Sequence, residues 1–206
     1  MPMSVHVVDA TILMDSQRFD RLGTVNRSDV VIEIGAACNG NQQIISQITN
    51  RVGLAQIDKL IFYGHAGPGI MNTAAGKEGG SVAENAGFGV DCRPGAPCDE
   101  NQWRTLAPYF APKGCVILKG CNVAQGSTGQ DLLRRLSRVF GVNVYGSDWY
   151  QATGMSYLVG NVYRASPDGS VVEDTGYKNG GLWRLLQEDA MAALAVGFAE
   201  LFYDPN

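Results

Sequence analysis

The sequence predicts an α/β fold in which helices flank a mainly parallel β-sheet, and two observations support this prediction. Short runs rich in β-branched residues alternate along the chain with segments whose apolar residues recur at helical spacing. Each run ends at glycine or polar residues, as the strands of a buried parallel sheet do. With 206 residues, the chain is long enough for one domain with a sizeable core, so we expect a single domain over residues 1–206.

The first half of the chain contains one predicted helix and one long loop in addition to its strands. Apolar residues recur at helical spacing over residues 41–52, and Gly53 is expected to end that helix. Residues 70–98 are Gly-rich and weakly patterned, so we expect a functional loop there, such as a lid or a self-processing site. The apolar runs predicted as strands are residues 5–8, 30–34 and 60–63.

Two helices are predicted in the middle of the chain. Residues 100–110 form a short helix with Asp99 as its N-cap, because an aspartate side chain accepts hydrogen bonds from the first helical N–H groups. Residues 127–140 form a longer helix with a buried apolar stripe, capped by Ser127 or Thr128 and ended by a glycine.

The last part of the chain adds strands, a hairpin and a terminal helix. Strands are predicted over residues 115–118 and 142–145, and a hairpin joins residues 158–163 to residues 170–173 around the turn sequence Ser-Pro-Asp-Gly. The terminal helix over residues 182–202 is apolar almost all round, and such a helix is either buried or docked on a partner.

Composition and charge narrow the classes of function. The net charge of −4 favours neither nucleic acid nor an anionic membrane surface as a partner. The N-terminal residues lack the pattern of a signal peptide, and no apolar stretch is long enough to span a bilayer. We therefore expect a soluble protein, either cytoplasmic or exported without a cleavable signal peptide.

Two residues with catalytic chemistry each follow a predicted strand. Ligands of parallel α/β sheets bind beyond the carboxyl ends of the strands, where His65 and Cys121 are expected. A cysteine attacks a carbonyl carbon as the thiolate, so it needs a neighbouring group that takes its proton, and histidine is the usual one. The chain has two histidines, and His6 lies within a predicted strand, where a structural or surface role is expected.

The motifs around these two residues resemble those of the caspase-like cysteine peptidase clan, which includes caspases, clostripain, gingipains and separases. The sequences GHAGPG and LKGCNVAQGSTGQDLLRRLSRVFGVNVYGSD look most like a bacterial domain often found at the N terminus of large exported, repeat-rich proteins. The resemblance covers residues 29–155, and residues 156–206 add the hairpin and the terminal helix. It implies a caspase-like sheet, His65 as general acid and base, and Cys121 as nucleophile.

The oxyanion hole and the substrate pocket are expected around the same two motifs. Gly120 leaves room for its own N–H and that of Cys121 to face a developing oxyanion. The clan usually has glycine directly after the histidine and uses its N–H in the same way; here Ala66 stands there, followed by Gly67. The residues expected to line the pocket are Lys119, Asp148 and Trp149, with Tyr150 beside them.

The charges of two expected pocket residues predict opposite substrates. Lys119 stands where caspases have a glutamine that helps to hold an acidic side chain, so the resemblance implies an acidic substrate residue. Asp148 favours a basic one, and the sequence does not decide between them.

Two other functions are compatible with the sequence, and a third, a metal site, is not expected. Cys38 stands at the start of a predicted helix, and followed by His65 it has the chain order of papain-like peptidases and cell-wall amidases. A caspase-like domain without activity would be a binding module. The cysteines at 92 and 98, and at 115 and 121, share a spacing that is not the tight spacing of structural zinc sites, so no metal or other cofactor is expected.

We therefore expect thiol-dependent hydrolysis of a peptide bond in a protein or peptide substrate. A bacterial secreted effector or toxin would suit a stand-alone domain of this kind, with the terminal helix as a surface for a partner or an immunity protein. Cys92 and Cys98 flank a Pro/Gly-rich turn and are expected to be free thiols, with a small disulfide loop as the alternative.

Overall fold

The computed structural model describes residues 2–9, 28–34, 40–73, 87–90, 92, 99–151 and 158–175. The chain divides into two units, Met1–Glu173 and Asp174–Asn206, and the helices and strands described below belong to the first. The terminal helix expected over residues 182–202 lies outside the described residues.

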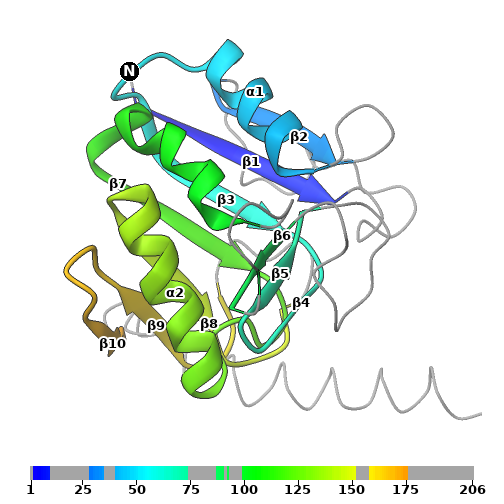
Figure 1. The fold of residues 1–206 in the computed structure, drawn as a ribbon, viewed down its shortest axis with the longest axis vertical. Helices are drawn as coiled ribbons and strands as arrows, with labels where there is room; N and C mark the ends of the chain where they lie inside the picture. Colours follow the sequence, from blue (N-terminus) through cyan, green and yellow to red (C-terminus); the bar gives the residue numbers. More distant parts are fainter. Residues whose placement is uncertain are drawn as a thin grey trace, which may run out of the picture. The chain divides into compact units, whose positions relative to one another are not determined.

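A seven-stranded sheet forms the centre of the first unit (Figure 1). Its strand order is β10-β9-β8-β7-β3-β1-β2. The five strands β2, β1, β3, β7 and β8 pair in parallel, and β9 and β10 extend the sheet as an antiparallel hairpin. The strands are β1 (Met3–Asp9), β2 (Val30–Ile34), β3 (Ile57–Tyr63), β7 (Phe110–Lys119), β8 (Asn143–Ser147), β9 (Val162–Ala165) and β10 (Val171–Glu173).

This arrangement confirms the predicted mainly parallel α/β sheet and the predicted C-terminal hairpin. The parallel strands lie in the order 2-1-3-4-5 of a doubly wound sheet. Chain connections run to one side after β1 and to the other side after β3, as in other folds of this kind. The hairpin is shorter than predicted, since its first strand begins at Val162.

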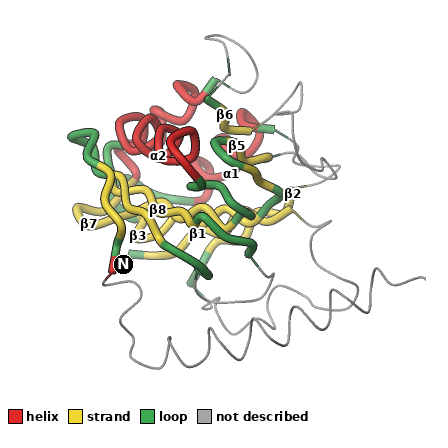
Figure 2. Tube along the Cα trace, turned by 90° about the horizontal axis from the view of Figure 1, so that it is seen from below, coloured by secondary structure: helices red, strands yellow, loops and turns green. Residues whose placement is uncertain are grey.

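The helices that the structure describes lie on one face of the sheet (Figure 2). They are α1 (Asn41–Arg51), the 3-10 helix η3 (Glu100–Tyr109) and α2 (Gly126–Phe140). Asp99 caps η3 as predicted, and its Oδ1 accepts a hydrogen bond from the N–H of Asn101. We predicted Ser127 or Thr128 as the cap of α2, which is wrong: the helix begins one residue before Ser127, and Gln125 occupies the cap position without a side-chain hydrogen bond.

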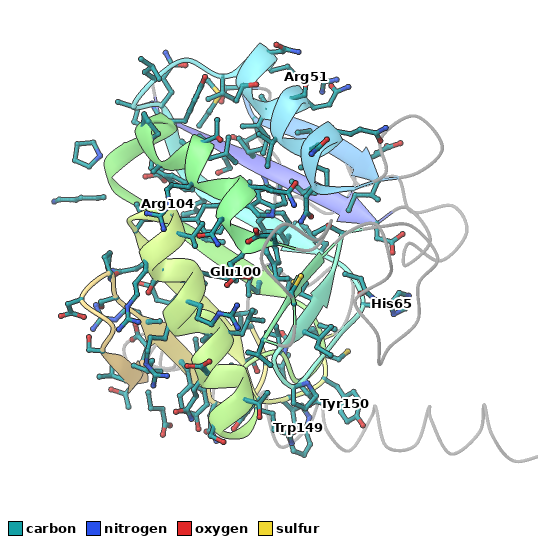
Figure 3. All side chains as sticks on the ribbon, viewed as in Figure 1. Arg51, His65, Glu100, Arg104, Trp149 and Tyr150 are labelled. Atoms are coloured by element: carbon teal, nitrogen blue, oxygen red, sulfur yellow. The ribbon has the colours of Figure 1, made fainter. Side chains whose placement is uncertain are left out.

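A partly buried ion pair joins η3 to α2. The Nε of Arg135 on α2 donates a hydrogen bond of 2.8 Å to Oε1 of Glu100 at the start of η3. Arg135 also donates to the carbonyl of Val90, with an Nη1–O distance of 2.7 Å. Figure 3 shows Glu100 between the two helices. Its carboxylate is therefore compensated by a charged partner, as burial of a carboxylate requires.

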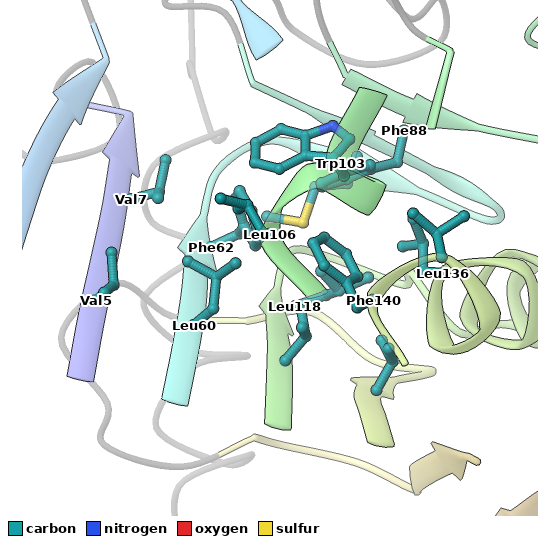
Figure 4. Packing of buried hydrophobic residues seen from close by; sticks show 14 of the residues in the cluster. Val5, Val7, Leu60, Phe62, Phe88, Trp103, Leu106, Leu118, Leu136 and Phe140 are labelled. Carbon is teal, nitrogen blue, oxygen red and sulfur yellow. The ribbon is translucent and has the colours of Figure 1, made fainter. Parts of the chain in front are cut away.

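Aromatic side chains fill the space between the sheet and these helices (Figure 4). Trp103 of η3 is fully buried, and its ring packs against Phe62, Phe88 and Phe140 with centroid distances of 5.2, 5.0 and 6.0 Å. Replacing a buried tryptophan with alanine typically costs about 3–5 kcal/mol, so this cluster contributes a large part of the stability. It also fixes η3 directly before β7, the strand that leads to Cys121.

A second, three-stranded sheet occupies part of the region predicted as a long loop. Its strands are β4 (Ala66–Gly67), β5 (Ile70–Asn72) and β6 (Gly87–Gly89), paired antiparallel in that order. Phe88 anchors β6 in the aromatic core. The prediction of a loop over residues 70–98 is thus wrong where β5 and β6 form, and most of the remainder lies outside the described residues.

Candidate active site

The two motifs that carry His65 and Cys121 follow neighbouring strands. β3 pairs with β7 in parallel, and the last pair in register is Tyr63 with Lys119. His65 and Cys121 therefore both stand two residues beyond the paired carboxyl ends of adjacent strands. The N–H of Gly64 extends the ladder by donating to the carbonyl of Lys119 over 3.5 Å.

Gly120 is in close contact with the segment that follows His65. A Cβ atom added to Gly120 would lie 2.3 Å from the Cβ of Ala66 and 3.2 Å from the carbonyl oxygen of Gly64. These distances are too short for a side chain, so glycine at this position is what allows the two strand ends to approach each other. Ala66 lies in β4 without a positive φ, so its methyl group imposes no backbone strain.

The turn that contains Cys121 is bonded on both sides. On one side, the N–H of Gly69 donates to the carbonyl of Val123 over 3.2 Å. On the other, the N–H groups of Asn122 and Ala124 donate to the carbonyls of Trp149 and Ser147, each over 2.9 Å. The turn is therefore held between the His65 segment and the loop that follows β8.

His65 is half-buried at the side toward which the parallel strands run (Figure 3). Its carbonyl accepts a hydrogen bond of 2.9 Å from the N–H of Asn72, which fixes the backbone at this point. In the part of the chain that the structure describes, the His65 ring and the Cys121 thiol form no hydrogen bond with each other. Such bonds are often long in enzymes without substrate and tighten in the substrate complex.

Cys121 is half-buried, and its sulfur faces the backbone of Gln151. The N–H of Gln151 lies 3.4 Å from Sγ, and the thiol donates to the carbonyl of the same residue over 3.9 Å. Gln151 was not among the residues that the sequence indicated, because main-chain atoms make this contact and leave no residue-type pattern.

The expected oxyanion donors lie around Cys121 in two groups. Ala66 and Gly67 form β4, which pairs with β5. Among the hydrogen bonds of the described residues, none uses the N–H of Gly120 or of Cys121. An oxyanion hole requires main-chain donors that no other group of the protein engages.

Lys119 lies on the sheet face opposite the described helices, in a buried polar cluster formed with Tyr63, His6 and Asp29. Only 8% of Lys119 is exposed, and its Nζ lies 5.0 Å from the centre of the Tyr63 ring. Burial lowers the pKa of the Lys119 ammonium to about 8. The structure therefore places this expected pocket residue against Tyr63, two positions before Cys121.

His6 belongs to the same polar cluster and is buried, which fits the structural one of the two roles expected for it and not the surface one. Its Nδ1 lies 3.3 Å from the hydroxyl of Tyr63, and its Nε2 lies 3.5 Å from Oδ2 of Asp29. Burial lowers the pKa of the His6 imidazole, and the nearby Asp29 carboxylate partly opposes that shift.

The other expected pocket residues lie on the loop after β8. Asp148 accepts hydrogen bonds from Asn161, 2.8 Å from its N and 2.9 Å from its Nδ2, so the Asp148 carboxylate braces this loop. Trp149 and Tyr150 are 42% and 64% exposed, and their rings form an edge-on pair 6.3 Å apart. Figure 3 shows both on the same side of the sheet as His65.

The remaining cysteines differ in chemical state. Cys115 is a free thiol whose pKa burial raises to about 11. Cys92 is disulfide-bonded, so the expectation of a free thiol there is wrong; that expectation was based on the inferred compartment, which does not determine the local geometry. Cys38 and Cys98 lie outside the described residues, as does the helix start proposed for Cys38.

Neither a metal cluster nor a membrane helix occurs in the part of the chain that the structure describes. No group of three or more His, Cys, Asp or Glu side chains is arranged to hold a metal ion among those residues. None of the described helices is long and apolar enough to cross a membrane.

Comparison with known proteins places the chain in a family by sequence. No curated protein and no solved structure matches it. One family model matches residues 6–163, which is most of the chain and includes both candidate catalytic residues. The chain therefore belongs to the family described as Domain of unknown function (DUF4347).

Proposed function

We propose that the chain is a caspase-like cysteine peptidase that hydrolyses a peptide bond with Cys121 as nucleophile and His65 as general acid and base. The observation that carries this proposal is the pairing of β3 with β7, which puts both residues two positions beyond adjacent strand ends. The strand order of the sheet and the motifs quoted above support the caspase-like assignment. A nucleophile and its base on neighbouring strand ends are supported by a rigid scaffold, as catalysis requires.

The first half of the reaction forms an acyl-enzyme. His65 takes the proton of the Cys121 thiol, and the sulfur attacks the carbonyl carbon of the substrate, which becomes a tetrahedral oxyanion. The unengaged N–H groups of Gly120 and Cys121 bind that oxyanion. When the intermediate collapses, the carbon–nitrogen bond breaks, and the leaving amine takes the proton from His65.

The second half releases the acid product. His65 takes a proton from water, and the resulting hydroxide attacks the thioester carbon. The carbon–sulfur bond then breaks, the thiolate is reprotonated, and the substrate fragment leaves as a carboxylic acid. Peptide and water are consumed and an amine and an acid are formed, so no cofactor enters the balance.

A library of cleavable peptides tests the proposal directly. The wild-type chain should cleave a subset of the library, and Cys121→Ala and His65→Ala should each reduce cleavage by at least about a thousandfold. Circular dichroism should show that both variants keep the wild-type fold. Cys115→Ala is the matched control, because burial raises the pKa of the Cys115 thiol to about 11. This variant should cleave the same peptides as the wild type. Loss of cleavage in Cys38→Ala with full cleavage in Cys121→Ala would show that the nucleophile is wrongly assigned.

A second candidate function is supported by the exposed aromatic pair. Trp149 and Tyr150 present large apolar rings to solvent beside the Cys121 turn, as binding surfaces often do. A binding module would retain a peptide on this surface without cleaving it. Peptides that bind equally well to the wild type and to Cys121→Ala, with no cleaved product in either, would favour this function over the peptidase.

A further inference from the structure

The loop after β8 is built against the sulfur of Cys121. Two hydrogen bonds join the loop to the Cys121 turn, from Asn122 to Trp149 and from Ala124 to Ser147. Four residues after β8 the main chain of Gln151 reaches the thiol, with the nitrogen 3.4 Å and the oxygen 3.9 Å from Sγ. The sulfur thus has one donor and one acceptor of the same residue beside it.

The donor and the acceptor favour different protonation states of the sulfur. A thiol donates its hydrogen to the carbonyl, whereas a thiolate is only an acceptor and gains from the N–H. A hydrogen bond to the charged form favours that form. The N–H of Gln151 therefore stabilises the thiolate, which is the form that attacks a carbonyl.

The side chain of Gln151 holds its own backbone in this position. Its Oε1 accepts from the N–H of Val159 over 3.0 Å, and its Nε2 donates to the carbonyl of Val159 over 3.0 Å. The same Nε2 lies 2.9 Å and 3.2 Å from the carbonyls of Trp149 and Tyr150. One amide group therefore ties the loop both to itself and to the segment before β9.

Only an amide can make this set of contacts. It needs one acceptor and a nitrogen with two hydrogens on the same planar group. Glutamate has the acceptor but no donor, and methionine has neither, although both have nearly the length of glutamine. The geometry thus depends on the residue type, while the atom that touches the sulfur belongs to the main chain.

We propose that Gln151 is a positioning residue: its side-chain amide holds the loop so that its main-chain N–H stabilises the Cys121 thiolate. This inference deepens the proposed peptidase function and depends on it for its biological meaning. The charged or titratable described groups on the surrounding elements include Tyr63 and His65 at the end of β3, Lys119 on β7, and Asp148 and Tyr150 in the same loop. They stay unchanged in Gln151→Met, so a change in thiol reactivity in that variant is assigned to the lost amide. Gln151→Glu also adds a carboxylate, which by itself disfavours a nearby thiolate.

Alkylation of the full-length chain by iodoacetamide across a pH range tests the inference without a substrate. Trypsin releases Cys121 and Cys115 in separate peptides, residues 120–134 and residues 114–119, so mass spectrometry follows each thiol. In Gln151→Met, Cys121 should react about tenfold more slowly near pH 7, the effect of shifting its alkylation midpoint upward by one pH unit. In Gln151→Glu, where the added carboxylate also disfavours the thiolate, the reaction should be at least as slow. At pH above the midpoint the rates should equal the wild-type rate, which a general loss of structure would not produce.

A control variant far from Cys121 and a second Gln151 variant complete the alkylation experiment. Gln42→Ala on α1 replaces an exposed glutamine and should leave the Cys121 profile unchanged. Gln151→Glu keeps the acceptor for Val159, so it provides a folded variant if Gln151→Met does not fold. A wild-type alkylation midpoint in a folded Gln151→Glu chain overturns the inference.

The outcome is separable from that of the peptidase test. If the midpoint moves while the wild type cleaves no peptide, Gln151 positions the thiol and the peptidase proposal fails. If peptides are cleaved and the midpoint does not move, the peptidase proposal stands and the role of Gln151 is refuted.

Discussion

Ala66 and Gly120 share a space that accommodates one methyl group. A Cβ on Gly120 would lie 2.3 Å from that of Ala66, well inside van der Waals contact. In the peptidase clan that the chain resembles, glycine usually follows the histidine, and alanine or glycine precedes the cysteine. Here alanine follows His65 and glycine precedes Cys121, so the methyl group stands on the β3 side of the contact.

This complementarity predicts the behaviour of a double-mutant cycle. Gly120→Ala should destabilise the fold by about 1–3 kcal/mol, the usual cost of overpacking. Ala66→Gly alone should cost about 0.5–1 kcal/mol through backbone entropy. The double variant should be more stable than Gly120→Ala, because the methyl group then occupies the same space from the other strand. Urea unfolding measures all four proteins, and additive effects of the two substitutions would contradict the shared space.

The cycle illustrates what the sequence could and could not predict about the site. The apolar runs before His65 and before Cys121 correctly placed each residue at a strand end. The pairing of these strands joins segments far apart in the chain, and the register of Tyr63 with Lys119 leaves no local pattern. The adjacency of the two residues therefore came from the motif resemblance in the sequence and from the register in the structure.

The sequence could not predict the short strands or the contacts made by main-chain atoms. β4, β5 and β6 have two or three residues each, too few to show an alternating pattern, and two of them lie in a region predicted as a loop. The contact of Gln151 with Cys121 spans 30 positions and uses backbone atoms. Both features arise from tertiary packing, which local propensity does not report.

Lys119→Met is expected to stabilise the fold at neutral pH. Burial lowers the pKa of Lys119 to about 8 from its ordinary 10.5, so the charged form carries a cost of about 3 kcal/mol below pH 8. The contact between the ammonium and the Tyr63 ring offsets about 1 kcal/mol of this cost. A methionine of similar length has no charge to desolvate, so urea unfolding at pH 7 should show a gain in stability that is smaller than this cost.

The pH dependence supplies the control for Lys119. Between pH 8 and pH 10.5 the folded chain releases the Lys119 proton while the unfolded chain keeps it, so wild-type stability should rise relative to Lys119→Met. Lys59→Met replaces an exposed lysine on β3 and should show neither the gain nor the pH dependence. A Lys119→Met chain that is less stable than the wild type at pH 7 would refute the burial cost.

His6 predicts a loss of stability in acid. Burial lowers the His6 pKa in the folded chain below its ordinary 6.5, so the unfolded chain binds the proton first as the pH falls. The contribution of neutral His6 to the free energy of unfolding is fully present above pH 6.5. It is lost as the pH falls from 6.5 through the folded-state pKa. His6→Gln should lose less stability than the wild type between pH 7 and pH 5 in urea unfolding. The control variant His65→Gln should lose as much stability as the wild type between pH 7 and pH 5, which would assign the acid effect to His6. If His6→Gln also loses as much stability as the wild type, His6 is not the cause.

Trp149→Ala is expected to weaken substrate binding and to leave the fold intact. The ring is 42% exposed beside the Cys121 turn, so its removal costs little packing, but it withdraws an apolar surface from any peptide bound there. KM for a cleaved peptide should rise by about tenfold, the ratio that 1.4 kcal/mol of binding free energy represents, while kcat stays near the wild-type value. Leu54→Ala removes an exposed apolar side chain before β3, at the opposite end of that strand, and should leave KM unchanged. Equal KM values for Trp149→Ala and the wild type would show that Trp149 does not contact the substrate. The exposed aromatic pair would then be a surface for a different partner.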